Sequence, residues 1–344
     1  MTRQLRLLAM ASGAVIFWGV SFPLTKGLLH YIGPLSIAFI RWTISALFLM
    51  LWLTRGKDRA SRSPFGQLPV AARLLSTSWP SVLWISLTGV TVFYAGENVA
   101  LRYTTATNAS VLSNLTSIFM VFIGFVWLRE RLSATEWLAA ALAFGGAALV
   151  SQGSGHFSLS STGLRGDLLM VLVSLSGAAY SIGSKQLVAS WPAEAIITAV
   201  AAVGAAGLLP LALLEGLHLN LPLTAWGMLI TLGIGAGALA NLWWIIILSQ
   251  TTAARASLII YFVPLVSTTL AVTLLDEPLT GTLILGGAMV LAAMVLADRH
   301  TRPGGVPVSV GDKVSHLYSD RDHDTDLAVA MQSESAGGPI DRDA

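Results

Sequence analysis

The sequence predicts an all-α membrane protein with ten transmembrane helices, arranged as two inverted five-helix repeats with both termini cytoplasmic. The first observation behind this prediction is composition: of 344 residues, 54% are hydrophobic and only 11% are charged. A soluble domain carries about 25% charged residues, so this chain has too few to cover a water-soluble surface. The other two observations are a set of ten long apolar runs and a sequence repeat.

The ten apolar runs each approach the roughly 20 residues that a helix needs to cross the hydrocarbon of a bilayer. They cover approximately 7–29, 34–53, 79–101, 107–127, 134–151, 167–189, 193–214, 224–249, 254–275 and 280–297. Their hydrophobicity is continuous rather than alternating, which argues against a membrane β-barrel. Most connections are short, so neighbouring helices must be antiparallel; the long basic segment 54–78 is the exception.

The distribution of Lys and Arg predicts the side of the membrane that each loop faces, because short cytoplasmic loops are enriched in these residues. With the amino terminus inside, sixteen of the 20 basic residues fall in inner segments. Lys26, Arg102 and Arg165 fall on the outer side, and Arg41 lies within a span. Both termini are therefore expected in the cytoplasm. The first apolar run is too long for a cleaved signal peptide, so we expect it to remain as the first helix.

The two halves of the chain share a sequence repeat. The stretch that begins at Thr105 recurs 147 residues later, at Thr252, and a weaker echo relates Trp18 to Tyr180 at an offset of 162. The matched pairs are Thr105/Thr252, Ala106/Ala253, Ala109/Ala256, Ser110/Ser257, Leu128/Leu275, Glu130/Glu277 and Leu132/Leu279. Because each half holds an odd number of spans, the second half enters the membrane upside down. Two inverted halves are the architecture of many secondary transporters.

The repeat defines the expected organisation of the chain. We expect a first five-helix repeat at 7–151, an outer linker at 152–166, a second five-helix repeat at 167–297 and a disordered cytoplasmic tail at 298–344. The tail holds nine of the 18 acidic residues and is rich in Gly, Pro and Ser, a composition that cannot bury enough apolar area to fold. An alternative role for the tail, metal binding by Asp322, His323, Asp324 and Asp326, has no fixed geometry behind it.

Several function classes conflict with the composition. The chain has no cysteine, which excludes disulfides and thiolate metal sites. The net charge of +2 is too small for a nucleic-acid footprint. All six histidines fall in predicted loops or the tail, and Glu97 is the only acid well inside a span. A polytopic membrane enzyme, which needs paired acids or a histidine-based site within the spans, is therefore the weaker alternative, and we expect no cofactor and no metal.

Motifs in both halves resemble the drug/metabolite transporter superfamily, EamA type. They are Trp18…Lys26 in the first span, Pro34…Arg41-Trp42 in the second, Ala100-Leu-Arg-Tyr-Thr-Thr-Ala106, Glu130-Arg-Leu132 and Gly166-Asp167-Leu168. The resemblance covers about 10–297. It implies an inner-membrane carrier of small metabolites, with a cavity between the halves lined chiefly by the first, third, fourth, sixth, eighth and ninth spans. Members of the family include amino-acid exporters. The second repeat departs from the pattern with Asp276-Glu277-Pro278.

Polar and aromatic residues within the spans are the candidates for the substrate cavity. The fourth span places Ser110, Ser113, Asn114 and Ser117 on one helical face, and the ninth span has Ser257, Tyr261 and Pro264 at equivalent places. Hydrogen bonding between helices is the alternative role for such residues. The predicted cavity set is Trp18, Asn98, Ser110, Asn114, Ser117, Tyr180, Asn241, Trp244, Ser257 and Tyr261.

Three charged residues fall at a similar depth in the spans: Glu97, Arg41 and Lys26. A charge inside a span is costly, by about 2.5–3.5 kcal/mol on insertion scales, and by default indicates function. One interpretation is a structural ion pair in which Glu97 neutralises Arg41, the likelier partner because it lies deeper than Lys26. The other makes Glu97 a site for a proton or a substrate amine.

The sequence therefore predicts a multi-pass inner-membrane transporter that exports small metabolites, such as amino acids, by alternating access. Its partners are the lipid bilayer and a small-molecule substrate. A non-transporting membrane sensor is a further alternative. The identity of the substrate, export or import, proton coupling or downhill flux, and a monomeric or homodimeric state stay open at this point.

Overall fold

The computed structural model describes residues 3–55, 68–128, 134–152, 162–250, 260 and 262–300, and every regular element in these ranges is a helix. The first half contains α1 (Arg3–Leu28), α2 (Pro34–Arg55), α3 (Leu68–Thr77), α4 (Trp79–Ser86), η1 (Leu87–Val92), α5 (Phe93–Tyr103), α6 (Ala106–Ser113), α7 (Leu115–Leu128) and α8 (Ala134–Gln152). The second half contains α9 (Thr162–Val188), α10 (Ala193–Glu215), α11 (Leu223–Ile230), η2 (Thr231–Leu239), α12 (Ala240–Gln250), α14 (Val263–Leu275) and α15 (Gly281–His300). Ser257, Tyr261, the Glu130 turn and the tail beyond residue 300 lie outside the described residues.

Five helices in the described part of the chain are long and apolar enough to cross a membrane. They are Leu5–Leu28, Pro34–Thr54, Gly163–Val188, Ala193–Glu215 and Leu223–Gln250, and three shorter apolar helices are Trp137–Val150, Val263–Leu275 and Gly281–Ala293. The third expected span is divided into α4, η1 and α5, and the fourth is interrupted between α6 and α7. The prediction of a helical, polytopic membrane protein is confirmed.

Two helix boundaries differ from those expected. Helix α9 begins at Thr162 rather than at 167, inside the segment expected to be a linker, and α15 continues to His300, into the segment assigned to the tail. The sequence prediction starts the sixth span at Asp167, because a charged residue is costly inside a membrane span. In the structure Asp167 is buried and accepts a hydrogen bond from the Thr104 hydroxyl, so its charge is accommodated inside the helix.

Local chemistry explains where several helices begin and end. Pro34 starts α2, where its fixed φ suits the first helical turn. Thr105 precedes α6 and its Oγ1 accepts from the backbone N–H of Asn108 at 3.0 Å, a standard N-cap interaction. Gly216, with φ of 90°, ends α10 in the left-handed conformation that glycine adopts without steric penalty.

In the described residues, each half contains one π-helical stretch at a corresponding position. Shifting η1 (Leu87–Val92) by the 147-residue offset places it at 234–239, within η2 (Thr231–Leu239). π-helices are rare and concentrate at functional sites. Sequence periodicity did not predict them, because a π-helical stretch replaces i→i+4 with i→i+5 hydrogen bonds without altering the apolar composition of the helix.

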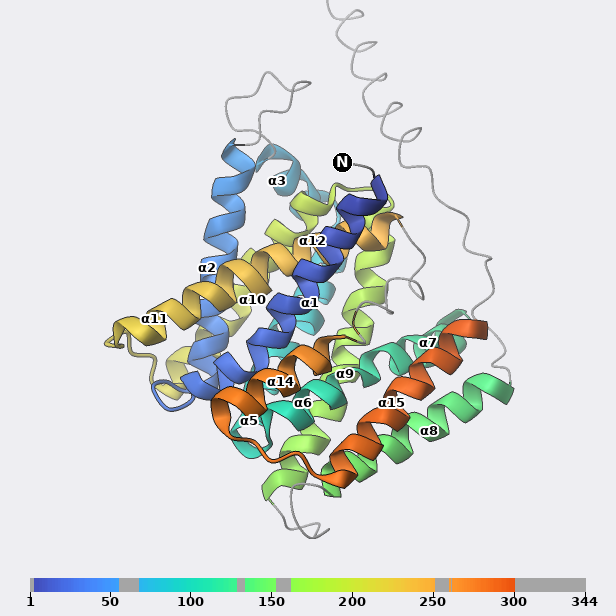
Figure 1. Cartoon of the computed structure of the whole chain (residues 1–344). Helices are drawn as coiled ribbons and strands as arrows, with labels where there is room; N and C mark the ends of the chain where they lie inside the picture. The colour runs from blue at the N-terminus through green and yellow to red at the C-terminus, as the bar shows by residue number, and fades with distance from the viewer. Residues whose placement is uncertain are drawn as a thin grey trace, which may run out of the picture. The chain divides into compact units, whose positions relative to one another are not determined.

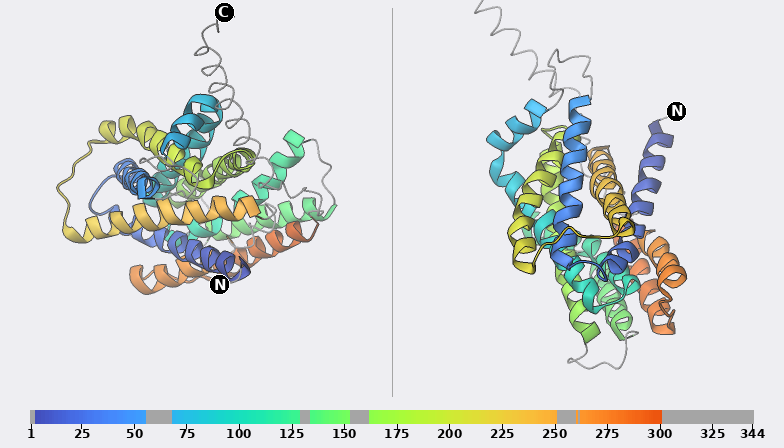
Figure 2. Two further views of the ribbon diagram at one scale, coloured as in Figure 1. Left: turned by 90° about the horizontal axis from the view of Figure 1, so that it is seen from above. Right: turned by 90° about the vertical axis from the view of Figure 1, so that its left-hand side faces the viewer.

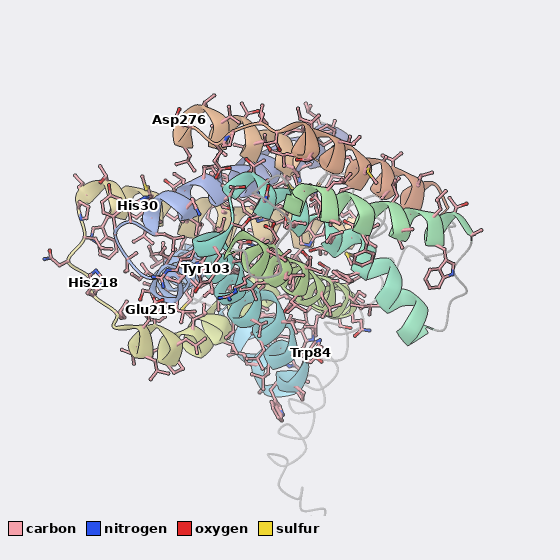
Figure 3. The ribbon with its side chains drawn as sticks, turned by 90° about the horizontal axis from the view of Figure 1, so that it is seen from below. His30, Trp84, Tyr103, Glu215, His218 and Asp276 are labelled. Atoms are coloured by element: carbon pink, nitrogen blue, oxygen red, sulfur yellow. The ribbon has the colours of Figure 1, made fainter. Side chains whose placement is uncertain are left out.

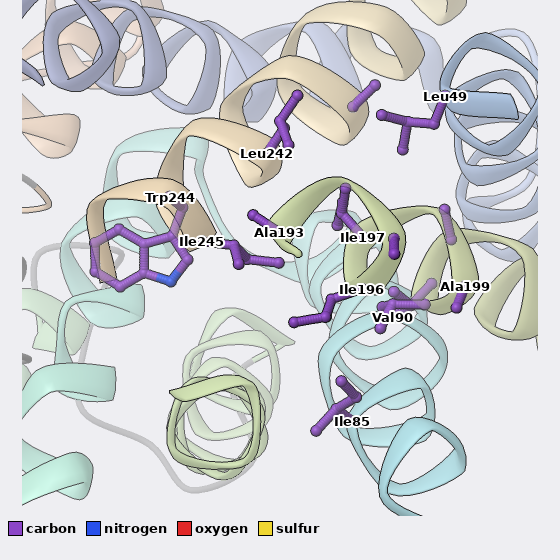
Figure 4. Packing of buried hydrophobic residues seen from close by; sticks show 14 of the residues in the cluster. Leu49, Ile85, Val90, Ala193, Ile196, Ile197, Ala199, Leu242, Trp244 and Ile245 are labelled. Atoms are coloured by element: carbon purple, nitrogen blue, oxygen red, sulfur yellow. The ribbon is translucent and has the colours of Figure 1, made fainter. Parts of the chain in front are cut away.

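The helices pack through three clusters of buried apolar residues. The largest joins α2, α4, α10 and α12, and Figure 4 shows Ile196 and Ile197 of α10 packed between Ile85 and Leu242 of neighbouring helices. Helix α1 lies between α12 and α14 (Figure 2). Helices α8 and α15 lie side by side (Figure 1). Elements from both halves of the sequence are therefore packed against each other.

Candidate functional site

A cavity of about 110 Å³ lies among helices of both halves. The six spans expected to line it all contribute, namely the first, third, fourth, sixth, eighth and ninth, and the second span adds Arg41. Its lining residues are Trp18, Ser21, Phe22, Arg41, Gly89, Phe93, Tyr94, Glu97, Ser113, Thr116, Gly177, Tyr180, Ser181, Asn241, Trp244, Ile260 and Val263. The surface is mainly aromatic and apolar, with a few convergent polar groups, which is the usual make-up of a small-molecule site.

Many of the lining residues occur in pairs related by the sequence repeat. Four pairs separated by 147 residues line the cavity, and so does the Trp18/Tyr180 pair at an offset of 162. The four pairs are Tyr94/Asn241, Glu97/Trp244, Ser113/Ile260 and Thr116/Val263. The two members of a pair differ in chemistry. In three pairs, Glu97/Trp244, Ser113/Ile260 and Thr116/Val263, the first half supplies a carboxylate or hydroxyl where the second supplies an indole or aliphatic group.

Arg41 and Glu97 meet at the cavity wall. Arg41 on α2 is fully buried, Glu97 on α5 is 3% exposed, and Nη1 of Arg41 lies 3.9 Å from Oε1 of Glu97. Opposite charges at this distance offset part of the desolvation that burial imposes on each. The structure thus brings together the two charges that the sequence analysis paired.

Tyr94 also contacts Arg41 and was missed by the sequence analysis. Its ring lies 4.3 Å from Cζ of Arg41, in range for a cation–π interaction. Edge-to-face contacts with Trp42 and Phe93, at centroid distances of 5.0 and 4.9 Å, fix the ring in turn. Tyr94 precedes Glu97 by three residues and so shares its helical face; this spacing is the signal that could have found it.

Aromatic rings form the rest of the wall. Trp18 of α1 and Trp244 of α12 meet edge to face at a centroid distance of 5.7 Å, and Tyr180 of α9 lies across Gly89 of η1, where a β-carbon would clash with its ring. Trp244 also borders the apolar cluster beside Ile245 (Figure 4). Asn241 joins the wall, and its Nδ2 donates to the carbonyls of Ala236 and Gly237 at 2.8 and 3.0 Å, which also satisfies carbonyl groups of η2.

The polar face predicted for the fourth span is rotated relative to the cavity. Of its residues, Ser113 and Thr116 line the cavity, whereas Ser110, Asn114 and Ser117 are buried elsewhere. The physical reason is the interruption at Asn114, between α6 and α7, which breaks the single helical periodicity on which the prediction relied. Ser110 instead donates to the Thr107 carbonyl at 2.8 Å.

Asn98 and Lys26 also serve as contacts between helices. Asn98 donates through Nδ2 to the Pro34 carbonyl at 3.0 Å. Lys26 donates through Nζ to the carbonyls of Leu101 and Thr104, both at 2.6 Å, at the carboxyl end of α5, where a helix favours a cation. Lys26 therefore does not share the position of Arg41. It borders a separate pocket of about 350 Å³ with Thr104, Thr105, Asn108 and Thr280, among others.

Carboxylates of the second half bind helix ends of the first half where α1 ends and α2 begins. Glu277 accepts from the backbone N–H groups of Ala106 and Thr107 at 2.7 and 3.0 Å, and from the Thr107 hydroxyl at 2.7 Å. Glu215 accepts from the N–H groups of Leu35 and Ser36 at 3.2 and 2.8 Å. Figure 3 looks onto this end, with Glu215 labelled near His30 and His218. Both carboxylates stabilise the amino end of a helix, which carries a partial positive charge.

Comparison with known proteins relates this chain to transporters. The model of the EamA-like transporter family matches residues 5–152 and 164–297. An uncharacterized transporter of Archaeoglobus fulgidus is 28% identical over 82% of this chain and 93% of its own length. A "probable terminal-alkyne amino-acid exporter" of Streptantibioticus cattleyicolor is 23% identical over 83% of this chain and 91% of its own. A solved crystal structure shares the fold, with a TM-score of 0.63 and 18% identity over 85% of this chain and 97% of the other.

Proposed function

Because the chain belongs to the EamA-like transporter family and is a multi-pass protein of the inner membrane, we propose that it exports small metabolites, amino acids or related compounds, by alternating access. The observation that carries this proposal is the cavity whose wall is built from repeat-related positions of both halves. A site between two halves can open to either side when the halves exchange conformations. The exporter of Streptantibioticus cattleyicolor supports amino acids as the first class to test.

The topology that fits this mechanism has ten spans in two inverted repeats, at 7–151 and 167–297, with both termini cytoplasmic. The repeat-related lining pairs and the π-helix in each half support it. In this topology the end of the molecule that bears Glu277 and Glu215 is the outer end. The excess of Lys and Arg on the opposite side supports the same orientation.

In this orientation, the contacts of Glu277, Glu215 and Asp167 hold the outer ends of the two halves together. Each carboxylate comes from the second half, and each of its partners described above comes from the first. Outward release of a substrate requires these contacts to separate. Helix α6 joins the two regions directly, because its amino end binds Glu277 and its last residue, Ser113, lines the cavity.

Two roles of Glu97 fit transport. As a structural partner it neutralises Arg41; as a coupling group it exchanges a proton with the cavity. We favour the structural role, because the two side chains are buried together at 3.9 Å and removal of one partner from a buried pair leaves an uncompensated charge.

Counterflow in proteoliposomes tests the proposed function. Purified protein reconstituted with an unlabelled L-amino acid inside is expected to accumulate the same labelled amino acid from outside, and liposomes without protein are not.

Cysteine at Trp18, in this naturally cysteine-free chain, is expected to react with a water-soluble thiol reagent and to be protected by that amino acid. Cysteine at Leu51, an exposed apolar residue of α2, is the matched control. Absence of counterflow for every amino acid and related amine tried would contradict the proposal.

A further inference from the structure

The guanidinium of Arg41 is buried and has no hydrogen-bond partner among the residues that the structure describes. Arg41 is fully buried, and within the described part of the chain its Nε, Nη1 and Nη2 atoms have no partner. A guanidinium presents five N–H donors in a planar fork, and burial of such a group without hydrogen bonds is costly. Glu97, at 3.9 Å, lies beyond the roughly 2.7–2.9 Å of a charge-assisted hydrogen bond. The fork of Arg41 therefore retains its binding capacity at the cavity wall.

Tyr94 keeps that fork available. Its ring lies against the guanidinium, with Cζ 4.3 Å from the ring centroid, so it attracts the cation through its π-system and not as a hydrogen-bond acceptor. The ring has little freedom to move, because Trp42 and Phe93 pack edge to face against it. Tyr94 thus fixes the direction of the fork while leaving its hydrogen bonds unmade.

The charges already present in the cavity wall limit which ligands the guanidinium of Arg41 can bind. Two parallel N–H groups of a guanidinium match the two oxygens of a carboxylate. A ligand with only a carboxylate would add a negative charge to a buried site that Arg41 and Glu97 already neutralise between them. A ligand that also carries an ammonium group keeps the site neutral, since Glu97 can face that ammonium.

The two halves carry different side chains at equivalent positions, so the cavity is chemically asymmetric. The position equivalent to Glu97 in the second half is Trp244, and the position equivalent to Tyr94 is Asn241. The charged groups of a ligand therefore face Arg41 and Glu97 of the first half, and its side chain faces the indole rings of Trp18 and Trp244, one from each half. A ligand enters this cavity in one orientation.

We propose that Arg41 binds the carboxylate of a zwitterionic substrate in the cavity and that Tyr94 is the positioning residue that presents its fork. This inference rests on the transport function proposed above. It concerns the group that is recognised, and it holds for any side chain that the cavity admits.

The test measures the dependence of counterflow on the substrate's carboxylate. Labelled L-amino acids and the corresponding amines are examined one at a time in proteoliposomes of the full chain. For each amino acid that is carried, competitors are the unlabelled amino acid, its carboxamide and its decarboxylated amine. The free amino acid is expected to compete at a concentration about 30-fold lower than the other two. Equal competition by the carboxamide would overturn the proposal while leaving transport established, and so would carriage of amines alone.

Two Tyr94 variants separate positioning from packing. Tyr94→Phe keeps the ring and is expected to retain wild-type discrimination between amino acid and carboxamide. Tyr94→Leu removes the cation–π contact with Arg41. Its half-saturation concentration is expected to rise about 10-fold and its discrimination to fall to a few-fold, with the maximal rate unchanged. Intact discrimination in Tyr94→Leu would show that Tyr94 only packs against Arg41. The competition series on the wild-type protein tests the requirement for a substrate carboxylate without any variant.

Discussion

The contact between Glu277 and the amino end of α6 allows a quantitative test of alternating access. In Glu277→Gln the side chain keeps one acceptor oxygen, but its amide nitrogen cannot accept the second backbone N–H bond, and the charge is lost. Hydrogen bonds to a charged group contribute about 1.5–3 kcal/mol each. Glu277 is only half-buried, so solvent reduces its contribution. We expect the free energy that favours the closed form of the outer end over the open form to fall by about 2 kcal/mol. This corresponds to a roughly 30-fold shift of the equilibrium toward the open form.

Thiol labelling measures this shift. A single cysteine replaces Thr116 on the cavity wall, and a membrane-impermeant maleimide is added to the outside of right-side-out vesicles. The labelling rate in the Glu277→Gln background is expected to exceed that in the wild-type background about 30-fold, since access requires the outer end to open. The melting temperature, measured in parallel, shows that the variant is folded.

Glu194→Gln is the matched control, because it makes the same chemical change in the first turn of α10, at the opposite end of the helices. It is expected to label at the wild-type rate. Labelling of Glu277→Gln within about twofold of wild type would refute the role of this contact in closing the outer end. An equal increase in both variants would refute its specificity.

Three further predictions follow from the same structure. Glu97→Gln is expected to lower the free energy of unfolding by roughly 3–5 kcal/mol, as for buried pairs generally. Addition of Arg41→Gln is expected to recover part of this loss. A stable Glu97→Gln protein that keeps counterflow but loses pH-driven flux would identify Glu97 as a coupling group instead. Reporter fusions after Arg131 and after Pro278 are expected on opposite sides of the membrane, and reporters on the same side would contradict the inverted repeat. Lys26→Met leaves two carbonyl groups at the end of α5 without their donor and is expected to reduce stability by about 2 kcal/mol in a denaturation assay, with no change in substrate discrimination.

The cavity was only partly predictable from the sequence. Trp18, Tyr180, Asn241 and Trp244, which the sequence analysis names for the substrate cavity, are among the lining residues; large or polar side chains within apolar spans stand out from their surroundings. Ser110 is not among the lining residues of this cavity; its predicted face assumes one continuous helix, and the chain is interrupted before α7. Tyr94 was missed because tyrosine in a span is also typical of an interfacial belt. Ser257 and Tyr261 stay predictions, as they lie outside the described residues.

The sequence by itself determined the properties that depend on solvent and on local periodicity. Too few charges for a water-soluble surface and apolar runs of about 20 residues specify a helical membrane protein, and the cost of a charge in lipid predicts that Glu97 and Arg41 need partners. The pairing of these two charges was an expectation from the sequence, but only the tertiary structure decided which partners the other charges find. Lys26 binds the end of α5, Glu277 binds the start of α6, and Tyr94 covers Arg41. These contacts join residues far apart in the chain, so no local periodicity in the sequence specifies them.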